Sequence, residues 1–249
     1  MTSLELLPPP PSWSEIALSQ DGVLGRRQAR LGGLSEDAWQ WRLDTGRWRS
    51  LLPGVAVTHS GEATARQCAW AAVLCAGSGA ALTGDAALGE QGMRLPSPSV
   101  LHVAVPHTRA VVARVLPAAG EGGRIVPHRV RRLQQWVHPV RRPPVVRAAP
   151  ALLHAVAWAD SDRAAEWRVA AAVQQRLLRP SDVRRALAGM PRRPRTRLVR
   201  TVLDDVELGA HAASELAFLR FLREHRLPLP DRLQRLVWPP RSTGRTTGW

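Results

Sequence analysis

The chain has 249 residues, of which 45% are hydrophobic, and this length and composition are typical of a globular protein with two or three compact units. Its formal net charge is +15, and all 35 of its Lys+Arg residues are arginines, which suit bidentate contacts to phosphate but also arise from a GC-rich coding sequence. An acid and a proline run stand where a signal peptide needs a basic start and an apolar core, and the longest uncharged run, residues 67–84, is too polar to span a membrane. These features predict a cytoplasmic protein with no membrane partner.

The first predicted unit covers residues 12–60 and has winged helix-turn-helix order. Its expected elements are helices over residues 13–18, 26–31 and 36–45 and strands over residues 48–52 and 55–59. Ser35 is the N-cap candidate of the third helix, glycines end the last two helices, and Pro53-Gly54 forms the turn between the strands. Such a module places its recognition helix in a major groove and its wing along the phosphates.

Polar side chains of this unit are the candidates for DNA contact. They are Arg26, Arg27, Gln28, Ser35, Gln40, Trp41, Arg47 and Arg49. The arginines are expected on phosphates, Ser35 and Gln40 nearest the bases, and Trp41 against a sugar or a thymine methyl. On a helical wheel, however, Asp37 and Asp44 share the outer face with Gln40 and Trp41, and their carboxylates oppose a close approach to phosphate.

Residues 61–145 are predicted to form a mixed α/β unit whose role the sequence does not state. Its expected elements are helices over residues 63–76 and 84–92 and strands over residues 100–105 and 125–130. A glycine-rich loop at residues 120–123 separates the two strands. Residues 108–150 carry nine arginines against the single acid Glu121, so this segment serves either nucleic-acid contact or a solvated basic surface.

Cysteines and histidines predict neither a disulfide nor a metal site. Cys68 and Cys75 lie seven residues apart in a predicted helix, which separates their α-carbons by about 10 Å, beyond disulfide reach. The histidines without zinc-ligand spacing, expected in loops or on the surface, are His102, His107, His128, His138 and His154. No cofactor and no metal are expected.

Residues 146–208 are predicted to be helical. Proline and glycine breaks separate four helices, expected over residues 148–159, 162–178, 181–188 and 195–207. The last segment, residues 231–249, is rich in Arg, Gly, Thr and Pro, and is expected to be disordered.

Short motifs in a fixed order carry a resemblance to a known family. They are Gly22-Val23, Arg27-Gln28-Ala29, Gly33-Leu34-Ser35, Gly46-Arg47-Trp48 and Pro53-Gly54-Val55, followed by weaker matches at residues 70–74, 80–83, 102–106 and 138–139. In these motifs the chain resembles the N-terminal antitoxin domain of the AbiEi family of type IV toxin-antitoxin systems, as it occurs in actinobacterial proteins. Ala56 departs from the family, which usually carries an aromatic there. The resemblance implies an autoregulator of its own operon and a partner toxin similar to a nucleotidyltransferase.

Residues 209–230, GAHAASELAFLRFLREHRLPLP, resemble the opening of a very-short-patch-repair-like endonuclease domain, which has a restriction-endonuclease-like fold. On a helical wheel Glu215 falls within an apolar stripe formed by Leu216, Phe218, Leu219 and Leu222. The matching glutamate of complete nucleases points at a metal site, which needs further carboxylates on a following hairpin. Because no acidic residue follows Asp231, we expect Glu215 to be a remnant and the chain to have no nuclease activity.

The predicted fold class is therefore α+β, with an N-terminal winged helix-turn-helix, a middle α/β unit and a helical region that ends in an incomplete nuclease fragment. Two hypotheses for function follow. In the first, the protein is a DNA-binding transcriptional regulator of antitoxin type, with double-stranded DNA and a nucleotidyltransferase-like toxin as partners. In the second, it is a degenerate member of the very-short-patch-repair-like endonuclease family, and its winged helix only docks onto a partner.

Overall fold

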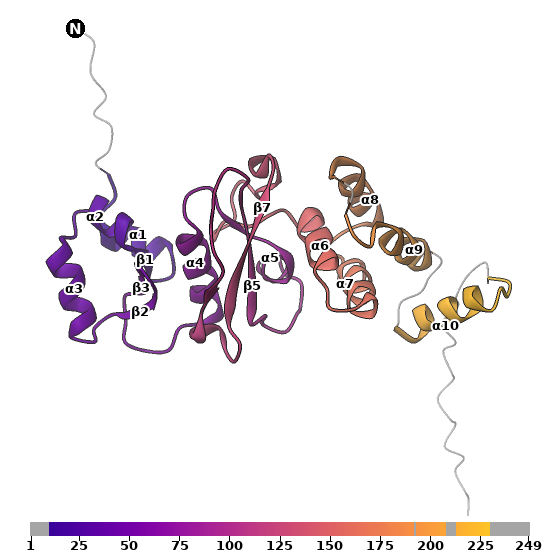
Figure 1. Ribbon diagram of the computed structural model, residues 1–249, viewed down its shortest axis with the longest axis horizontal. Helices are drawn as coiled ribbons and strands as arrows, with labels where there is room; N and C mark the ends of the chain where they lie inside the picture. The colour runs from indigo at the N-terminus through magenta and orange to yellow at the C-terminus, as the bar shows by residue number, and fades with distance from the viewer. Residues whose placement is uncertain (1–9, 192, 208–212, 230–249) are drawn as a thin grey trace, which may run out of the picture.

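The computed structural model describes residues 10–191, 193–207 and 213–229. These residues form an α+β molecule with two small sheets, arranged as a row of three parts followed by a last helix (Figure 1). The tail over residues 231–249, expected to be disordered, and the acid-free segment after Asp231 lie outside the described residues. Within the described chain, no helix combines the length and the apolar character needed to cross a bilayer.

The N-terminal part contains three helices and a three-stranded antiparallel sheet. Its elements are α1 (Trp13–Ser19), β1 (Val23–Gly25), α2 (Arg26–Leu31), α3 (Glu36–Asp44), β2 (Arg49–Leu52) and β3 (Val55–Val57). The strand order is β1-β3-β2, so β3 pairs with both neighbours. The three helices and two strands expected here are present. Strand β1 was not expected, because three residues are too few to show a periodicity in the sequence.

Local capping explains where the N-terminal helices begin and end. Ser12 Oγ accepts a hydrogen bond from the backbone nitrogen of Glu15, and Glu15 Oε2 accepts one from the backbone nitrogen of Ser12, which completes a capping box at α1. Gly32 follows α2, where an added Cβ would lie 2.4 Å from the backbone nitrogen of Trp13. Only glycine therefore allows α1 and α2 to approach so closely at this point.

Tryptophan side chains fill the small core of the N-terminal part. The rings of Trp39 and Trp48 meet edge to face with centroids 5.4 Å apart, and the ring of Trp13 lies 5.4 Å from that of Trp48. Ala56 is fully buried in this cluster. The opposite face of the sheet, including Val23 and Val57, packs into the core of the middle part. The N-terminal part is thus joined to its neighbour through a shared apolar face.

The middle part is built around a four-stranded sheet. Its elements are α4 (Ala65–Ala76), β4 (Ala81–Leu82), α5 (Gly84–Glu90), β5 (Val100–Pro106), β6 (Arg114–Val115), η1 (Pro117–Ala119), β7 (Arg124–Val130) and η2 (Leu133–Trp136). The strand order is β4-β5-β7-β6, with β5 and β7 parallel and the two edge strands antiparallel. The expected helices are present, and the two expected strands do pair; the short edge strands were not expected.

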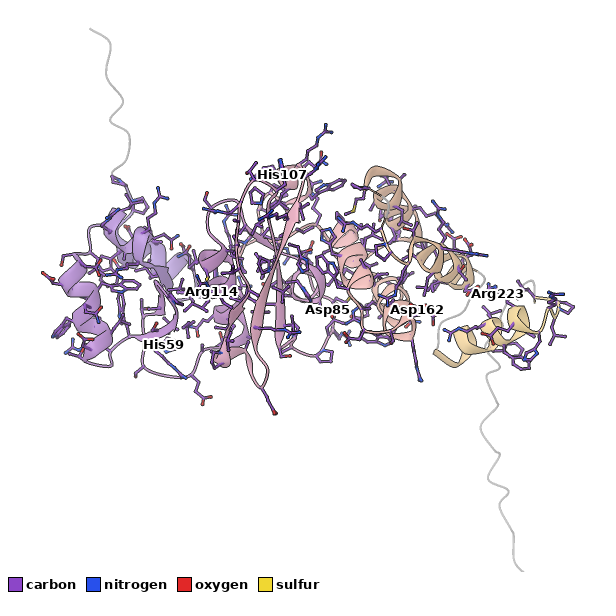
Figure 2. All side chains as sticks on the ribbon, viewed as in Figure 1. His59, Asp85, His107, Arg114, Asp162 and Arg223 are labelled. Atoms are coloured by element: carbon purple, nitrogen blue, oxygen red, sulfur yellow. The ribbon has the colours of Figure 1, made fainter. Side chains whose placement is uncertain are left out.

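The helical part contains the four expected helices. They are α6 (Ala148–Ala157), α7 (Asp162–Gln174), α8 (Pro180–Gly189) and α9 (Thr196–Glu207). Helix α5 packs against α6, so the apolar core continues from the sheet into this part. Asp85 of α5, labelled in Figure 2, accepts hydrogen bonds from Arg168 of α7, with Nη2–Oδ2 and Nε–Oδ1 distances of 2.6 and 2.9 Å. This bidentate pair fixes α7 against α5.

The last described helix, α10 (Ala213–Glu224), lies at the far end of the row and contacts α9 (Figure 1). Among its described side chains, Leu219 and Leu222 are buried, whereas Phe218 is half exposed. The expected apolar stripe is therefore not packed at Phe218. Ion pairs complete the contact, between Arg220 and Glu166 and between Arg223 and Asp205.

Candidate nucleic-acid interface

Two of the predicted phosphate-binding arginines, Arg47 and Arg49, lie at the start of β2. Arg47 and Arg49 are exposed, and Trp48 between them is buried, as alternation along an extended segment requires. Among the described residues, no carboxylate lies within ion-pair distance of either guanidinium. Both cations are therefore available to an anionic partner.

Trp41 on α3 lies between two guanidinium groups. The Cζ atom of Arg47 is 4.6 Å from the centroid of its ring, and that of Arg42 is 5.9 Å from it. Arg42 also lies over the rings of Trp13 and Trp48, at 5.2 and 5.3 Å, and donates to the carbonyl oxygen of Ala38. These contacts hold the half-exposed ring of Trp41 in place beside a free cation. Arg42 was not among the predicted site residues, and its helical-wheel position among apolar neighbours was the only signal for its role.

The two arginines at the start of α2 differ in their partners. Arg26 forms an ion pair with Glu36 at the start of α3, with Nε–Oε2 and Nη2–Oε1 distances of 2.9 and 2.5 Å. The hydrogen bond raises the pKa of Arg26 and lowers the pKa of Glu36. Arg27 is exposed and forms no ion pair with any described carboxylate. Of this pair, only Arg27 offers phosphate an uncompensated charge.

Gln28 and Ser35 both serve the local fold. The side-chain amides of Gln28 and Gln20 bond to each other at 2.9 and 3.1 Å, and Gln28 Oε1 also accepts from the backbone nitrogen of Gly25. Ser35 Oγ accepts from the backbone nitrogen of Ala38 at 3.2 Å, which makes Ser35 the N-cap of α3 as its position in the sequence predicts. Gln28 is therefore partly buried, whereas Ser35 is exposed at the start of α3.

The outer face of α3 is acidic. Asp37, Gln40 and Asp44 are exposed on it, and Gln40 Nε2 donates to Asp44 Oδ1 at 2.8 Å. Figure 1 shows α3 on the outer side of the N-terminal part, away from α4. This arrangement agrees with the helical wheel and leaves the Gln40 amide engaged within its own helix. The exposed carboxylates of Asp37 and Asp44 oppose the approach of a phosphate backbone to this face.

Three histidines come together between the sheet and the helical part, which the sequence did not predict. His102 of β5 and His128 of β7 hydrogen bond through Nδ1 and Nε2 at 2.8 Å, and the rings of both stack on Trp158. His154 of α6 is fully buried beside Trp158, and its Nδ1 lies 2.6 Å from Thr83 Oγ1. The expectation of loop or surface positions is thus wrong for these three. Parallel pairing of β5 with β7 causes the meeting, and no residue spacing reveals it.

Burial makes these histidines neutral. Loss of solvent lowers the pKa of His128 to about 4 and that of His154 to about 3, and it also lowers the pKa of His102. Neutral imidazoles can bind metals, but the described residues contain no group of three or more His, Cys, Asp or Glu side chains that could hold one.

The remaining predicted residues concern redox state and nuclease chemistry. Cys68 and Cys75 are both free thiols, as the sequence predicts; Cys68 is buried and Cys75 is half-buried. Burial raises the pKa of each thiol. Glu215 is half-buried in the first turn of α10. The carboxylates nearest to α10 in the ion-pair network, Glu166 and Asp205, bind arginines of that helix rather than forming an open metal site with it.

Comparisons with known proteins add no assignment. No model of a known protein family matches the chain, and no curated protein matches it.

Proposed function

We propose that the protein is a cytoplasmic DNA-binding transcriptional regulator of antitoxin type, similar to AbiEi, that represses its own operon. One observation carries the proposal: the N-terminal part has the order α1-β1-α2-α3-β2-β3 and its strands pair in the order β1-β3-β2, and this order of helices and strands supports a winged helix-turn-helix. The resemblance in ordered motifs points the same way. A nucleotidyltransferase-like toxin is the protein partner that this function implies.

The distribution of charge assigns the roles in DNA binding. Arg27, Arg47 and Arg49 are exposed cations that form no ion pair with a described carboxylate, and they would hold phosphates. Trp41, kept in place by Arg42 and Arg47, would lie against a sugar or a thymine methyl. Because the outer face of α3 is acidic, Gln40 would reach bases only after its bond to Asp44 opens.

A binding titration against the DNA upstream of the protein's own gene tests this function. The full chain should prefer this duplex over a scrambled duplex of equal length, and its affinity should fall as salt rises. Arg47→Gln and Arg49→Gln should each weaken binding, whereas Arg26→Gln should weaken it less because Glu36 already occupies that guanidinium. Equal binding of both duplexes would contradict the regulator.

The acidic face of α3 favours a second function, in which the N-terminal part only docks onto a protein partner within a degenerate nuclease-family protein. Asp37 and Asp44 on either side of a half-exposed Trp41 suit a basic protein surface better than a phosphate backbone. Asp37→Asn with Asp44→Asn separates the two functions. If α3 faces DNA, removal of both charges should tighten DNA binding; if α3 only docks, DNA binding should stay unchanged.

We also propose that the chain has no catalytic activity, with Glu215 a remnant. Purified protein with Mg²⁺ or Mn²⁺ should leave duplex DNA intact, since two-metal or one-metal cleavage needs several carboxylates around the ion. Metal-dependent cleavage that is lost in Glu215→Ala would overturn this assignment.

A further inference from the structure

A groove of about 1000 Å³ lies between the N-terminal part and the middle part. One wall is the start of α2 with the β2–β3 turn at Gly54, which are joined by a hydrogen bond from the backbone nitrogen of Arg26 to the carbonyl oxygen of Gly54. The other wall is the end of α4 and the segment that leads into α6, residues 134–147. We call it the arginine groove, after the side chains described next.

The arginine groove is lined by cations and by no carboxylate. Arg26 and Arg27 come from α2, Arg109 from the loop after β5, and Arg142 and Arg147 from the segment before α6. Arg26 is paired with Glu36, but none of the other four forms an ion pair with a described carboxylate, although many other arginines of the chain do, such as Arg66, Arg168 and Arg184. The groove therefore carries positive charge that an anionic partner would neutralise.

The groove is held in shape by contacts between the two parts. Arg66 of α4 binds Asp21 before β1 at 3.0 Å and Glu90 of α5 at 2.5 Å, and its Nη2 donates to the carbonyl oxygen of Arg142 at 2.5 Å. Asp21 Oδ2 also accepts from Trp70 Nε1 at 2.7 Å. These bonds fix the N-terminal part and the backbone at Arg142 against the same helix.

Hydrogen bonds to the backbone also hold the guanidinium of Arg109 in place. Its Nη1 donates to the carbonyl oxygen of Ser78 at 2.8 Å and to that of Ala76 at 3.4 Å, at the C-terminal end of α4. Gly77 has a positive φ of 86°, and an added Cβ there would lie 2.6 Å from Arg109 Nη1, so a side chain at this position would displace the guanidinium.

We infer that the arginine groove binds the phosphate backbone of double-stranded DNA, as an extension of the surface that reads the operator. This inference rests on the proposed function. The groove shares Arg27 with the proposed DNA-binding surface and begins at the β2–β3 turn, which is the tip of the proposed wing. A duplex on that turn continues into the groove, where guanidinium forks from the middle part match phosphate oxygens.

The experiment measures the affinity of the full chain for two labelled duplexes, its own upstream DNA and a scrambled sequence, over a range of KCl concentrations. The groove variant is Arg142→Gln with Arg147→Gln. The matched control is Arg163→Gln with Arg200→Gln, which removes two exposed arginines of α7 and α9 that also lack described ion pairs. Thermal unfolding of each variant checks that the fold is retained.

The groove variant should lower the slope of log K against log[salt] by roughly 0.9 for each phosphate that the protein no longer neutralises, hence by about two on both duplexes, while the control keeps the wild-type slope. An unchanged slope in the groove variant, or an equal reduction in the control, would overturn the inference. So would binding of a glutamate-rich peptide that depends on Arg142 and Arg147 while duplex binding does not. The scrambled duplex allows the two proposals to be tested separately. If the wild type binds both duplexes equally, the proposed regulator function is wrong. The salt dependence of binding to scrambled DNA still shows whether the arginine groove contacts phosphates.

Discussion

Gln28 shows how a side chain that suits DNA readout can instead belong to the protein interior. Both ends of its amide are engaged, by Gln20 and by the backbone nitrogen of Gly25. An amide satisfied in this way gains nothing by turning toward a base. We therefore expect Gln28 to support α2 and its approach to β1 rather than to read sequence.

Gln28→Ala should lower the free energy of unfolding by about 1–3 kcal/mol, because the buried Gln20 amide keeps only its bond to the carbonyl oxygen of Val23 and the Gly25 N–H loses its acceptor. Urea denaturation measures this. Gln40→Ala is the control, since that exposed side chain bonds only to Asp44, and its effect should stay within about 0.5 kcal/mol. A Gln28→Ala protein of unchanged stability that loses DNA affinity would restore the base-reading role.

At the scale of elements, the start of α3 combines a structural role with an exposed position. Ser35 caps the helix through Ala38, and a contact with DNA would use the same hydroxyl. Ser35→Ala should destabilise the protein by about 1 kcal/mol, whereas Ser35→Asp should retain the cap and its stability.

The two Ser35 variants also separate capping from DNA contact. If Ser35 only caps α3, Ser35→Asp should bind DNA more weakly than the wild type solely through its added negative charge, an effect that high salt removes. If the hydroxyl contacts a base, both variants should lose sequence preference at every salt concentration. Binding titrations on the upstream and scrambled duplexes provide the measurement.

Helices were more predictable than strands in this chain because their signals are local. Ser35, the glycines after α2 and α3, and Pro180 at the start of α8 act within one turn of the backbone, and each stands where its helix begins or ends. Strands β1, β4 and β6 have two or three residues and exist only through their neighbours. Strands β5 and β7 themselves were predictable, but their parallel pairing depends on the whole connection between them.

At the scale of the whole molecule, Asp21 ties the N-terminal part to α4. Its φ of 54° suits Asn as well as Asp, so Asp21→Asn keeps the conformation and an acceptor for Trp70 while removing the charge that Arg66 binds. Asp21→Ala should cost about 1–3 kcal/mol, because the buried Trp70 N–H loses its acceptor. Asp21→Asn should cost less, within about 1 kcal/mol, since the pair with Arg66 is half-exposed. Thermal or urea unfolding of both variants measures their loss of stability. Equal losses in the two variants would show that the ion pair with Arg66 contributes more than the hydrogen bond to Trp70.

The buried histidines link stability to pH. Their folded pKa values lie below the unfolded value of 6.5, so the unfolded chain binds protons first as pH falls. Their contribution is therefore complete above about pH 6.5, and it is lost progressively as pH falls from there toward about 4 for His128 and about 3 for His154.

Urea midpoints measured between pH 7.5 and 5, above the range in which ordinary carboxylates titrate, should fall steadily with pH. His128→Gln should make the urea midpoint depend less on pH, even if it lowers stability at pH 7.5, because it removes one imidazole whose pKa is lowered in the folded protein. His107→Gln, at an exposed position, should keep the wild-type slope. A wild-type midpoint that does not change over this range would contradict the buried neutral state.

By itself, the sequence determined the α+β class, the helices of all three parts, the two free cysteines and the acidic outer face of α3, because caps, breaks and helical periodicity act over a few neighbouring residues. Only the tertiary structure decided the pairing of Arg26 with Glu36, the inward position of Gln28, the meeting of three histidines and the gathering of four unpaired arginines in one groove. Each of these joins residues from different elements, and such contacts depend on how the elements pack.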